Sequence, residues 1–254
     1  MMKFNAIKVS LITGFMALST PAIAVDLEAM SESDQALFGE LVRDYLVNNP
    51  EVIMEAIQIL QERQATAEEQ SEIALISENI EEIQNDGFSW VGGNPDGDIT
   101  LVEFVDYKCH YCRKAHDDVV ALVKADGNIR LVVKEYPILS QDSLISSQAA
   151  IAALQSQGSD AYKKMYNSLI KFDGPVNDKS IAFIANKAGL DGDKIVAQMQ
   201  EPAVAQHIAR TRQLGETLQV SGTPTFLFND QIVRGYVPKD AMEQIIAELR
   251  ANTQ

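Results

Sequence analysis

Two cysteines separated by two residues are the part of this sequence most directly capable of chemistry. Cys109 and Cys112 are the only cysteines among 254 residues, and they lie between an apolar run and a helical pattern. A cysteine at the start of a helix lies where backbone N–H groups and the helix dipole stabilise a thiolate. Lys108 and His110 flank the first cysteine and add positive charge. We therefore expect Cys109 to be a low-pKa nucleophile and the deeper Cys112 to be the resolving thiol.

Other uses of a cysteine pair fit this sequence less well. A structural zinc site needs four ligands, and Cys109, Cys112 and His116 make three at most. A c-type haem needs histidine directly after the second cysteine, where this chain has Arg113. A disulfide across two residues closes too small a loop to restrain the fold. Two thiolates can bind a soft ion such as Cu(I), so that role stays open beside redox catalysis. His116 itself is expected to be a surface or packing residue.

The segments around the cysteines alternate between strand and helix. Residues 99–105 are apolar and β-branched, residues 115–123 have helical spacing up to Gly127, and residues 129–133 form a second buried strand. This βαβ unit implies a parallel pair of strands. Residues 141–219 are helical with short breaks, which predicts an insertion of three to five helices. A hairpin of strands at 223–228 and 231–236 and a helix to about residue 251 complete an α/β fold.

The segment from 26 to 86 is predicted to be helical throughout, with no chemistry of its own. Two apolar series with a spacing of four lie on one helical face, and Asn49-Pro50-Glu51 is a helix-restart signal. The series are Leu37, Leu41 and Tyr45, and Phe38, Val42 and Leu46. Such a face packs either on the rest of the chain, as a capping helical hairpin, or on copies of itself. We favour self-association.

The N-terminus and the net charge indicate a compartment. Residues 1–24 combine Lys3 and Lys8 with a short apolar run and end on Ala22-Ile23-Ala24, which is typical of a cleaved signal peptide rather than a membrane anchor. Export places the dithiol in an oxidising compartment, expected to be the periplasm. The formal charge of −15 argues against binding to nucleic acid or to an anionic membrane, and solubility explains it.

Three stretches together resemble a known family. They are Val102-Glu103-Phe104-Val105-Asp106-Tyr107-Lys108-Cys109-His110-Tyr111-Cys112, the later Gly222-Thr223-Pro224-Thr225-Phe226, and the N-terminal Tyr45-Leu46-Val47-Asn48-Asn49-Pro50-Glu51-Val52. The chain is similar to the DsbA-like thioredoxin superfamily and, within it, to the oligomeric periplasmic branch of ScsC-type and DsbA-like outer-membrane immunoreactive proteins. The resemblance implies a thioredoxin fold (βαβ–ββα) over 87–254, with the helical insertion at about 141–219 and an N-terminal oligomerisation region at 25–86.

The resemblance also assigns roles to individual residues. Thr223 and Pro224 match a cis-proline loop that faces the dithiol and binds an extended substrate segment, with His110 and Tyr111 expected to contact the same substrate. Glu103 lies six residues before Cys109, in a strand whose other residues are expected to be buried in the core. A buried carboxylate can move protons for a buried thiol. In the family such a glutamate stands near a lysine of the next strand, for which Lys134 is the candidate. Asp106 is the alternative acid.

These observations predict a periplasmic thiol-disulfide oxidoreductase, an isomerase or shuttle, that exchanges disulfides with secreted proteins. The alternatives are a disulfide-donating oxidase of DsbA type and a Cu(I)-binding protein for copper tolerance. The expected partners are cysteine-containing exported proteins, a membrane redox protein like DsbB or DsbD, and further copies of this chain as a dimer or trimer. No cofactor, metal or nucleic acid is expected. Outer-membrane or surface association is a variant of the periplasmic location.

Overall fold

The computed structural model describes residues 30–252. The signal peptide expected at 1–24 therefore lies outside the described residues. The chain divides into two compact units, Met1–Arg63 and Gln64–Gln254. The first contains α1 (Glu32–Asn48) and the first part of α2 (Glu51–Glu78), so the predicted restart after Asn49-Pro50 is confirmed. Ser31 caps α1 by accepting a hydrogen bond from the Asp34 N–H.

The second unit is built on a mixed five-strand sheet with the order β1-β3-β2-β4-β5. The parallel pair β2 and β3 is the βαβ unit expected from the sequence, and β1, β4 and β5 are added antiparallel. The strands are β1 (Trp90–Gly93), β2 (Ile99–Val105), β3 (Ile129–Glu135), β4 (Thr225–Phe228) and β5 (Gln231–Arg234). The predicted thioredoxin fold is confirmed.

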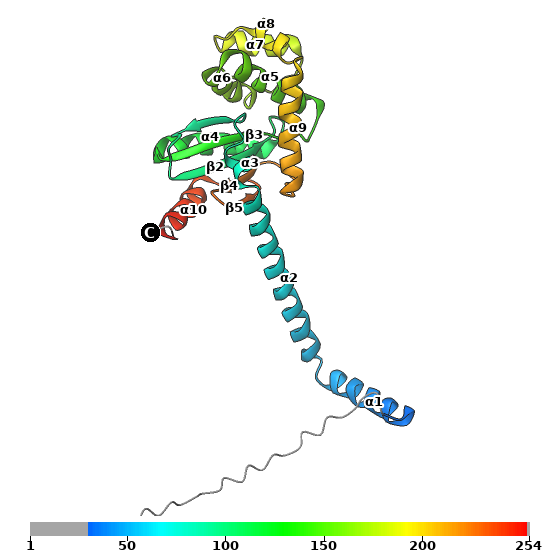
Figure 1. The fold of residues 1–254 in the computed structure, drawn as a ribbon. Coiled ribbons are helices and arrows are strands. Elements are labelled where there is room, and N and C mark those ends of the chain that lie inside the picture. Colours follow the sequence, from blue (N-terminus) through cyan, green and yellow to red (C-terminus); the bar gives the residue numbers. More distant parts are fainter. Residues whose placement is uncertain (1–29, 253–254) are drawn as a thin grey trace, which may run out of the picture. The chain divides into compact units, whose positions relative to one another are not determined.

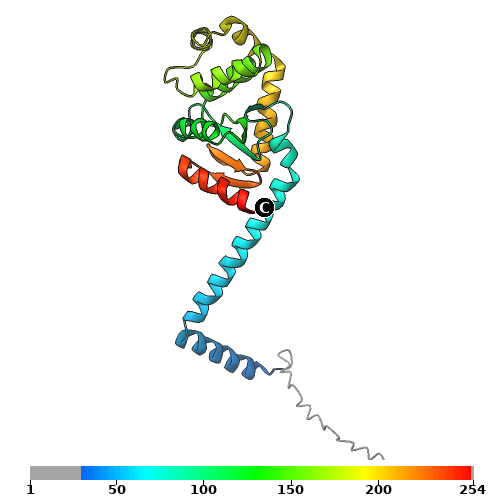
Figure 2. The same cartoon turned by 90° about the vertical axis from the view of Figure 1, so that its left-hand side faces the viewer.

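Five helices form the insertion between β3 and β4 (Figures 1 and 2). They are α5 (Gln141–Gln157), α6 (Ser159–Leu169), α7 (Asp178–Lys187), α8 (Gly192–Gln198) and α9 (Pro202–Thr217). In Figure 1, α5 to α8 gather at one end of this unit while α9 runs back along the sheet. At that point α9 comes very close to the end of β3, since a Cβ on Gly215 would lie 2.4 Å from the Tyr136 ring.

The two faces of the sheet bury different sets of side chains, because successive strand residues point to opposite faces. Ile99, Leu101 and Val105 of β2 pack with α4 (His110–Asp126), α5, α6 and the C-terminal α10 (Lys239–Asn252) in one core. Val102 and Phe104 pack on the other face with α3 (Ile80–Gln84) and the end of α9. We call these the α4 face and the α3 face of the sheet.

Candidate active site

Cys109 is the N-cap residue of α4. Its backbone is extended, at φ −71° and ψ 120°, and its Sγ accepts a hydrogen bond from the Cys112 N–H at 3.4 Å. Both cysteines are free thiols. Cys109 is 7% exposed whereas Cys112 is fully buried, so only Cys109 can be reached by another molecule. The nucleophile and the resolving thiol predicted from the sequence thus occupy different environments.

The environments drive the pKa values of the two thiols apart. A hydrogen bond from the Cys112 side chain lowers the pKa of Cys109 to about 6. Partial burial opposes this effect, and the Thr223 side chain and the backbone N–H groups of Cys112 and Tyr111 add to it. Burial raises the pKa of Cys112 far above its ordinary value. The hydrogen bond that the Cys112 thiol donates to Cys109 adds to this rise, because it holds the proton on Cys112. Lys108 contributes little here, because its Nζ donates to Gly174 O and lies 3.8 Å from Asp142.

The loop before β4 faces the Cys109 sulfur. The Thr223–Pro224 peptide bond is cis, and the Cys109 thiol donates a hydrogen bond to the Thr223 carbonyl oxygen at 3.0 Å. The Pro224 carbonyl is held on the other side by the Gly235 N–H at 2.9 Å. Two segments more than a hundred residues apart in sequence therefore meet at the reactive sulfur, as the resemblance implied.

Glu103 lies on the α4 face of the sheet and is fully buried. Its Oε2 accepts a hydrogen bond from the Tyr166 hydroxyl at 2.7 Å, while its Oε1 has no partner among the described residues. Burial raises the pKa of Glu103 to about 7, with the Tyr166 bond opposing this and the charges of Glu135 and Cys109 adding to it. A carboxyl group in this state can both give and take a proton at neutral pH.

Lys134 does not stand beside Glu103, which corrects the pairing expected from the resemblance. The register aligns Phe104 with Lys134, so the lysine points to the α3 face, opposite the glutamate. There the buried Nζ forms a 2.6 Å ion pair with Asp86 and donates to Glu82 O at 2.8 Å. Lys134 thus ties the segment after α3 to the sheet and does not touch the thiols.

Exposed side chains lie next to Cys109 in the sequence and on the loop after β3, which Asp106 joins to the segment before Cys109. Tyr111 is 56% exposed and stacks on Tyr236, while the His110 ring meets the Tyr111 ring edge-on. On another side, Ile138 and Leu139 are exposed in the loop after β3. This rim is apolar and aromatic around a single reachable sulfur.

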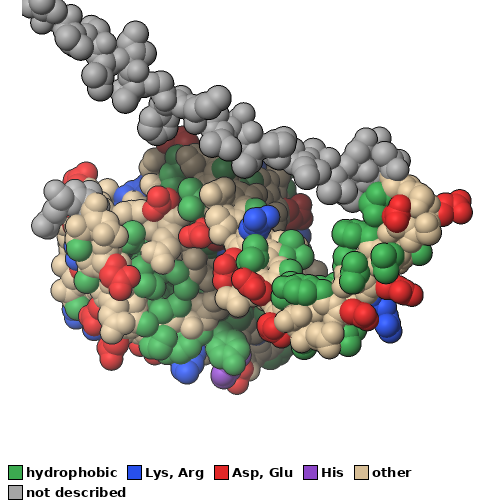
Figure 3. Space-filling view, turned by 90° about the horizontal axis from the view of Figure 1, so that it is seen from below, with side chains coloured by type: hydrophobic (Ala, Val, Ile, Leu, Met, Phe, Trp, Pro, Cys, Tyr) green, Lys and Arg blue, Asp and Glu red, His purple; other side chains and the backbone are tan. Residues whose placement is uncertain are grey.

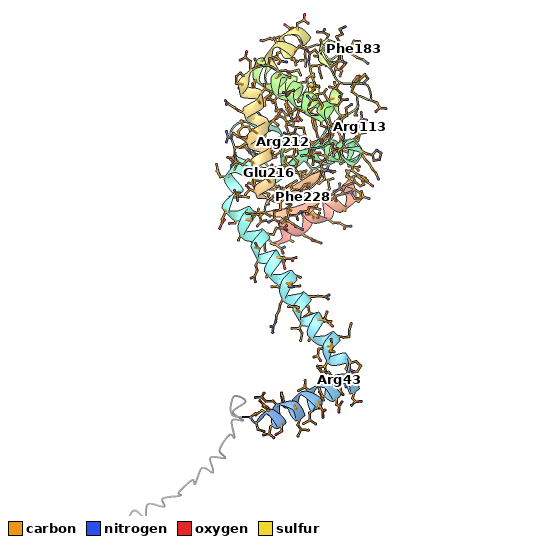
Figure 4. All side chains as sticks on the ribbon, turned by 90° about the vertical axis from the view of Figure 1, so that its right-hand side faces the viewer. Arg43, Arg113, Phe183, Arg212, Glu216 and Phe228 are labelled. Carbon is orange, nitrogen blue, oxygen red and sulfur yellow. The ribbon has the colours of Figure 1, made fainter. Side chains whose placement is uncertain are left out.

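Arginine and aspartate side chains hold the loops of this rim. Asp106, the alternative acid of the sequence prediction, is buried and accepts three backbone N–H bonds, from Lys108, Ile138 and Leu139. Arg113 of α4, labelled in Figure 4, donates to Ile170 O and Phe172 O and pairs with Asp173, which links α4 to the loop after α6. Arg212, also labelled there, donates to Pro137 O.

His116 is a packing residue, one of the two roles expected for it, and Trp90 is a packing residue as well. His116 is buried on α4 against the Tyr166 ring, and burial lowers its pKa to about 4. Trp90 stacks on Tyr162 and donates its ring N–H to Ser159 Oγ at 2.8 Å. Neither side chain reaches the sulfur of Cys109 through a hydrogen bond of the described residues.

Sequence reasoning missed a second buried carboxyl group, Glu135, and the tyrosines around it. Glu135 is the last residue of β3, and its Oε1 accepts hydrogen bonds from Tyr107 and Tyr162 at 2.7 and 2.6 Å. The sequence prediction ended this strand at Val133, two residues early. Continuing the strand's alternation would have placed Glu135 on the same face as Leu131 and Val133. The β2–β3 register makes this also the face of Glu103.

Two properties of the part of the chain that the structure describes bear on other roles. Between residues 30 and 252, no cluster of three or more His, Cys, Asp or Glu side chains is arranged to hold a metal ion. Over the same residues, no helix has the length and apolar character needed to cross a membrane.

With this geometry established, comparison with known families gives two matches. Residues 100–247 match the family described as DSBA-like thioredoxin domain, and residues 34–67 match the family described as copper resistance protein ScsC N-terminal domain. The first match covers the strands β2 to β5, the cysteine pair, the cis-proline loop and the helical insertion, and it begins after β1. The second covers most of α1 and the first part of α2.

Two solved structures and one curated protein show how far the similarity extends. A thioredoxin-like oxidoreductase from Silicibacter pomeroyi DSS-3 is 37% identical, with a TM-score of 0.63 over 67% of this chain and 97% of that one. Proteus mirabilis ScsC in a compact conformation is 27% identical, with a TM-score of 0.63 over 85% and 97%. The Na(+)/H(+) antiporter NhaA 1 of Salinispora arenicola is 27% identical over 165 residues, 65% of this chain. This chain spans about a quarter of that antiporter's length.

Proposed function

This chain belongs to the family of DSBA-like thioredoxin domains, and from that membership we propose that it exchanges disulfides with exported proteins through Cys109 and Cys112. The observation that carries the proposal is the asymmetry of the pair. One thiol is reachable and has a pKa of about 6, and the other is fully buried with a raised pKa. A site built this way attacks with the first sulfur and resolves with the second.

In the reductive direction, the Cys109 thiolate attacks one sulfur of a substrate disulfide and the other substrate sulfur leaves. The resulting mixed disulfide joins Cys109 to the substrate. Cys112 then attacks Cys109, the substrate thiolate leaves, and the Cys109–Cys112 disulfide forms. In the oxidative direction the same steps run backwards. A thiolate of low pKa is also a good leaving group, so the mixed disulfide turns over in either direction.

The substrate is an extended segment of a cysteine-containing exported protein. It lies along the Thr223-Pro224 loop, whose carbonyl already faces the Cys109 sulfur at 3.0 Å. An extended peptide can pair with exposed backbone at such a loop. Tyr111, Ile138 and Leu139 offer exposed apolar contacts on the rim, which suits segments exposed before folding is complete. Glu103 exchanges the proton of Cys112.

The protein works as an isomerase or shuttle in the periplasm, as a dimer or trimer joined through residues 25–86. The support is the exposure of α1, which buries none of its residues although it carries Leu37, Phe38 and Leu41, 50–61% exposed. Apolar stripes of this width are covered in stable proteins. A membrane protein of the DsbB or DsbD kind resets the dithiol. A disulfide-donating oxidase and a Cu(I)-binding protein are the alternatives.

The test compares the parent protein with Cys109→Ser and Cys112→Ser in two assays, reduction of insulin and refolding of scrambled ribonuclease. We expect activity in the parent and none in Cys109→Ser, because a serine hydroxyl stays protonated near neutral pH and does not attack a disulfide. Cys112→Ser should accumulate mixed disulfides with substrate, because it attacks but cannot resolve. A parent inactive in both assays that binds Cu(I) tightly would establish the copper alternative. Recovery of the dithiol mostly oxidised from cells would favour the oxidase.

A further inference from the structure

Glu135 is a buried acid that the thiol chemistry described so far does not use. Its side chain is fully buried at the end of β3. Two hydroxyl groups donate to its Oε1, from Tyr107 at 2.7 Å and from Tyr162 at 2.6 Å. Its Oε2 has no hydrogen-bond partner among the described residues. The nearby Ser147 hydroxyl of α5 nevertheless lowers the pKa of Glu135 and so favours its ionised form. An apolar core tolerates such a group only when something compensates its burial.

Glu135 and Glu103 share one pocket of the α4 face. Register pairs Glu103 with Val133 and Val105 with Glu135, so both acids point the same way. Strand spacing of about 4.8 Å and a rise of about 3.3 Å per residue put their Cα atoms about 8 Å apart. Tyrosine rings fill the space between them, because Tyr166, which donates to Glu103, stacks on Tyr162 with ring centroids 6.2 Å apart.

No cation among the described residues compensates the two carboxyl groups. The groups that face the pair from every packed element are acids, thiols, hydroxyls or a neutral histidine. They are Asp106 and Tyr107 of the loop after β2, Cys109, Cys112 and His116 of α4, Ser147 of α5, and Tyr162 and Tyr166 of α6. Lys134 lies on the opposite face. Two like charges in this setting are strongly disfavoured, so the pair carries one.

Burial raises the pKa of Glu103 and that of Glu135 alike, each to about 7, so burial does not distinguish the two acids. The hydrogen bonds decide where that single charge resides. Glu135 has two hydroxyl donors and Glu103 has one, while each of them also has one oxygen without a partner among the described residues. Burial raises the pKa values of Tyr107, Tyr162 and Tyr166 well above the ordinary value, so all three remain donors. A carboxylate is stabilised by each donor, and the better-supplied Glu135 therefore holds the charge.

Resting on the proposed thiol-disulfide exchange, we propose that Glu135 is a positioning residue, whose buried carboxylate holds the charge of the pair so that Glu103 keeps an exchangeable proton for Cys112. When a substrate thiolate attacks Cys109 of the disulfide, the new sulfur–sulfur bond forms and the Cys109–Cys112 bond breaks. Its electron pair goes to the Cys112 sulfur, which takes the Glu103 proton and becomes a thiol. In the reverse step, Cys112 returns the proton to Glu103 as it attacks Cys109.

The experiment follows the infrared absorption of the protonated carboxyl group in the oxidised protein between about pH 5 and about pH 9. We expect the parent band to titrate near pH 7. Glu135→Gln, which removes the second charge, should lower the midpoint by at least about one pH unit. Glu135→Asp keeps the charge and should restore the midpoint toward that of the parent. Tyr166→Phe removes the donor of the Glu103 carboxylate and should raise the midpoint. Tyr162→Phe removes a donor from Glu135, which is already ionised, and should not raise it.

A kinetic readout tests the link to the thiols. At pH 7, a one-unit fall would reduce the protonated fraction of Glu103 from about a half to about a tenth, so attack of a small thiol on the oxidised protein should slow about fivefold in Glu135→Gln. The substitution should have no such effect in a Glu103→Gln background. A rate lowered equally in both backgrounds would assign Glu135 a merely structural role and overturn the proposal.

An unchanged infrared midpoint in Glu135→Gln would also overturn it. Should that variant fail to fold, Tyr166→Phe and Tyr162→Phe decide, since a midpoint raised by Tyr162→Phe but not by Tyr166→Phe contradicts the assignment of the charge. The infrared titration needs no turnover. Failure of the disulfide-exchange assays would therefore refute the proposed function without moving this midpoint, and the two outcomes stay separate.

Discussion

The thiolate of Cys109 is stabilised mainly by hydrogen bonds that its own motif supplies, with a further contribution from the Thr223 side chain. The sulfur accepts the Cys112 N–H because it caps α4, and the Cys112 side chain is the largest contribution to its lowered pKa. The flanking lysine is engaged with Gly174 and Asp142. Short-range geometry rather than a nearby cation therefore sets the reactivity of this residue.

A first prediction concerns the titration of that thiolate. In the reduced protein, ultraviolet absorbance of the thiolate should titrate with a midpoint near pH 6. Cys112→Ala should raise the midpoint, because it removes the side-chain donor. Cys112→Ser keeps a hydroxyl donor at the same position and is the matched control, with a midpoint closer to that of the parent. Equal midpoints in both variants would show that the Cys112 side chain does not stabilise the thiolate.

The same pKa makes the stability of the reduced form depend on pH. The pKa of Cys109 is lowered to about 6 from an ordinary value of 9.0. The folded reduced state therefore binds the Cys109 proton less tightly than the unfolded chain does. Its contribution to stability should be complete above about pH 9, decrease as the pH falls, and be lost below about pH 6. Denaturant unfolding of the reduced protein across this range measures it, and the oxidised protein, without this thiol, is the control.

At the scale of elements, alternation along β3 separates two polar clusters. Val133 and Glu135 face α4, while Val132 and Lys134 face α3. On the α3 side, the buried Lys134–Asp86 pair joins β3 to the segment between α3 and β1, and Phe88 of that segment packs edge-on against the buried His207 of α9. This cluster fixes the chain entering the sheet, so its role is structural.

The prediction at this scale is that Lys134→Met lowers the free energy of unfolding by about 3–5 kcal/mol, because it leaves Asp86 buried without its partner. The Cys109 thiolate should titrate as in the parent, since the lysine lies on the other face of the sheet. Lys164→Met, at an exposed position of α6, is the control and should change stability little. A Cys109 titration shifted by Lys134→Met but not by Lys164→Met would restore the lysine to the active site.

For the whole molecule, the main open surface is the apolar side of α1. Figure 3 shows hydrophobic side chains gathered on the helix next to the grey residues, and Leu37, Phe38, Leu41, Val42 and Tyr45 are 41–61% exposed. Their spacing of three and four places them on one side of the helix. Nothing in residues 30–252 of a single copy buries this side of α1, since α1 has no buried residue.

We therefore predict that Leu41→Glu converts the protein to a monomer, as measured by light scattering, because a charge at the centre of this stripe cannot be buried. Arg43→Gln changes the net charge by the same amount from the opposite side of α1, near the label in Figure 4, and should keep the assembly. A parent that is already monomeric would refute self-association. Scrambled ribonuclease refolding by the monomeric variant then shows how far isomerisation needs paired active sites.

Local patterns in the sequence were enough for much of this description. The strand before Cys109 and the helix after it follow from apolar periodicity and from breakers such as Gly127, whose left-handed backbone ends α4. The same signals predicted a helical insertion of three to five helices, of which the structure has five. The division of labour between Cys109 and Cys112 follows from which one begins the helix. These are properties of neighbouring residues, so they can be read without the fold.

What the tertiary structure alone decided is which distant residues meet. The extent and register of β3 place Glu135 beside Glu103 and Lys134 beside Asp86. The strand predicted from the sequence ended two residues earlier and included neither residue. The tyrosines that supply the acids come from the loop after β2 and from α6, about thirty to sixty positions away in sequence. In the sequence the cysteine pair is a reactive motif. Which face of the sheet each β3 residue points to, and how α6 packs on that face, determine which acidic side chains near the cysteines hold a proton.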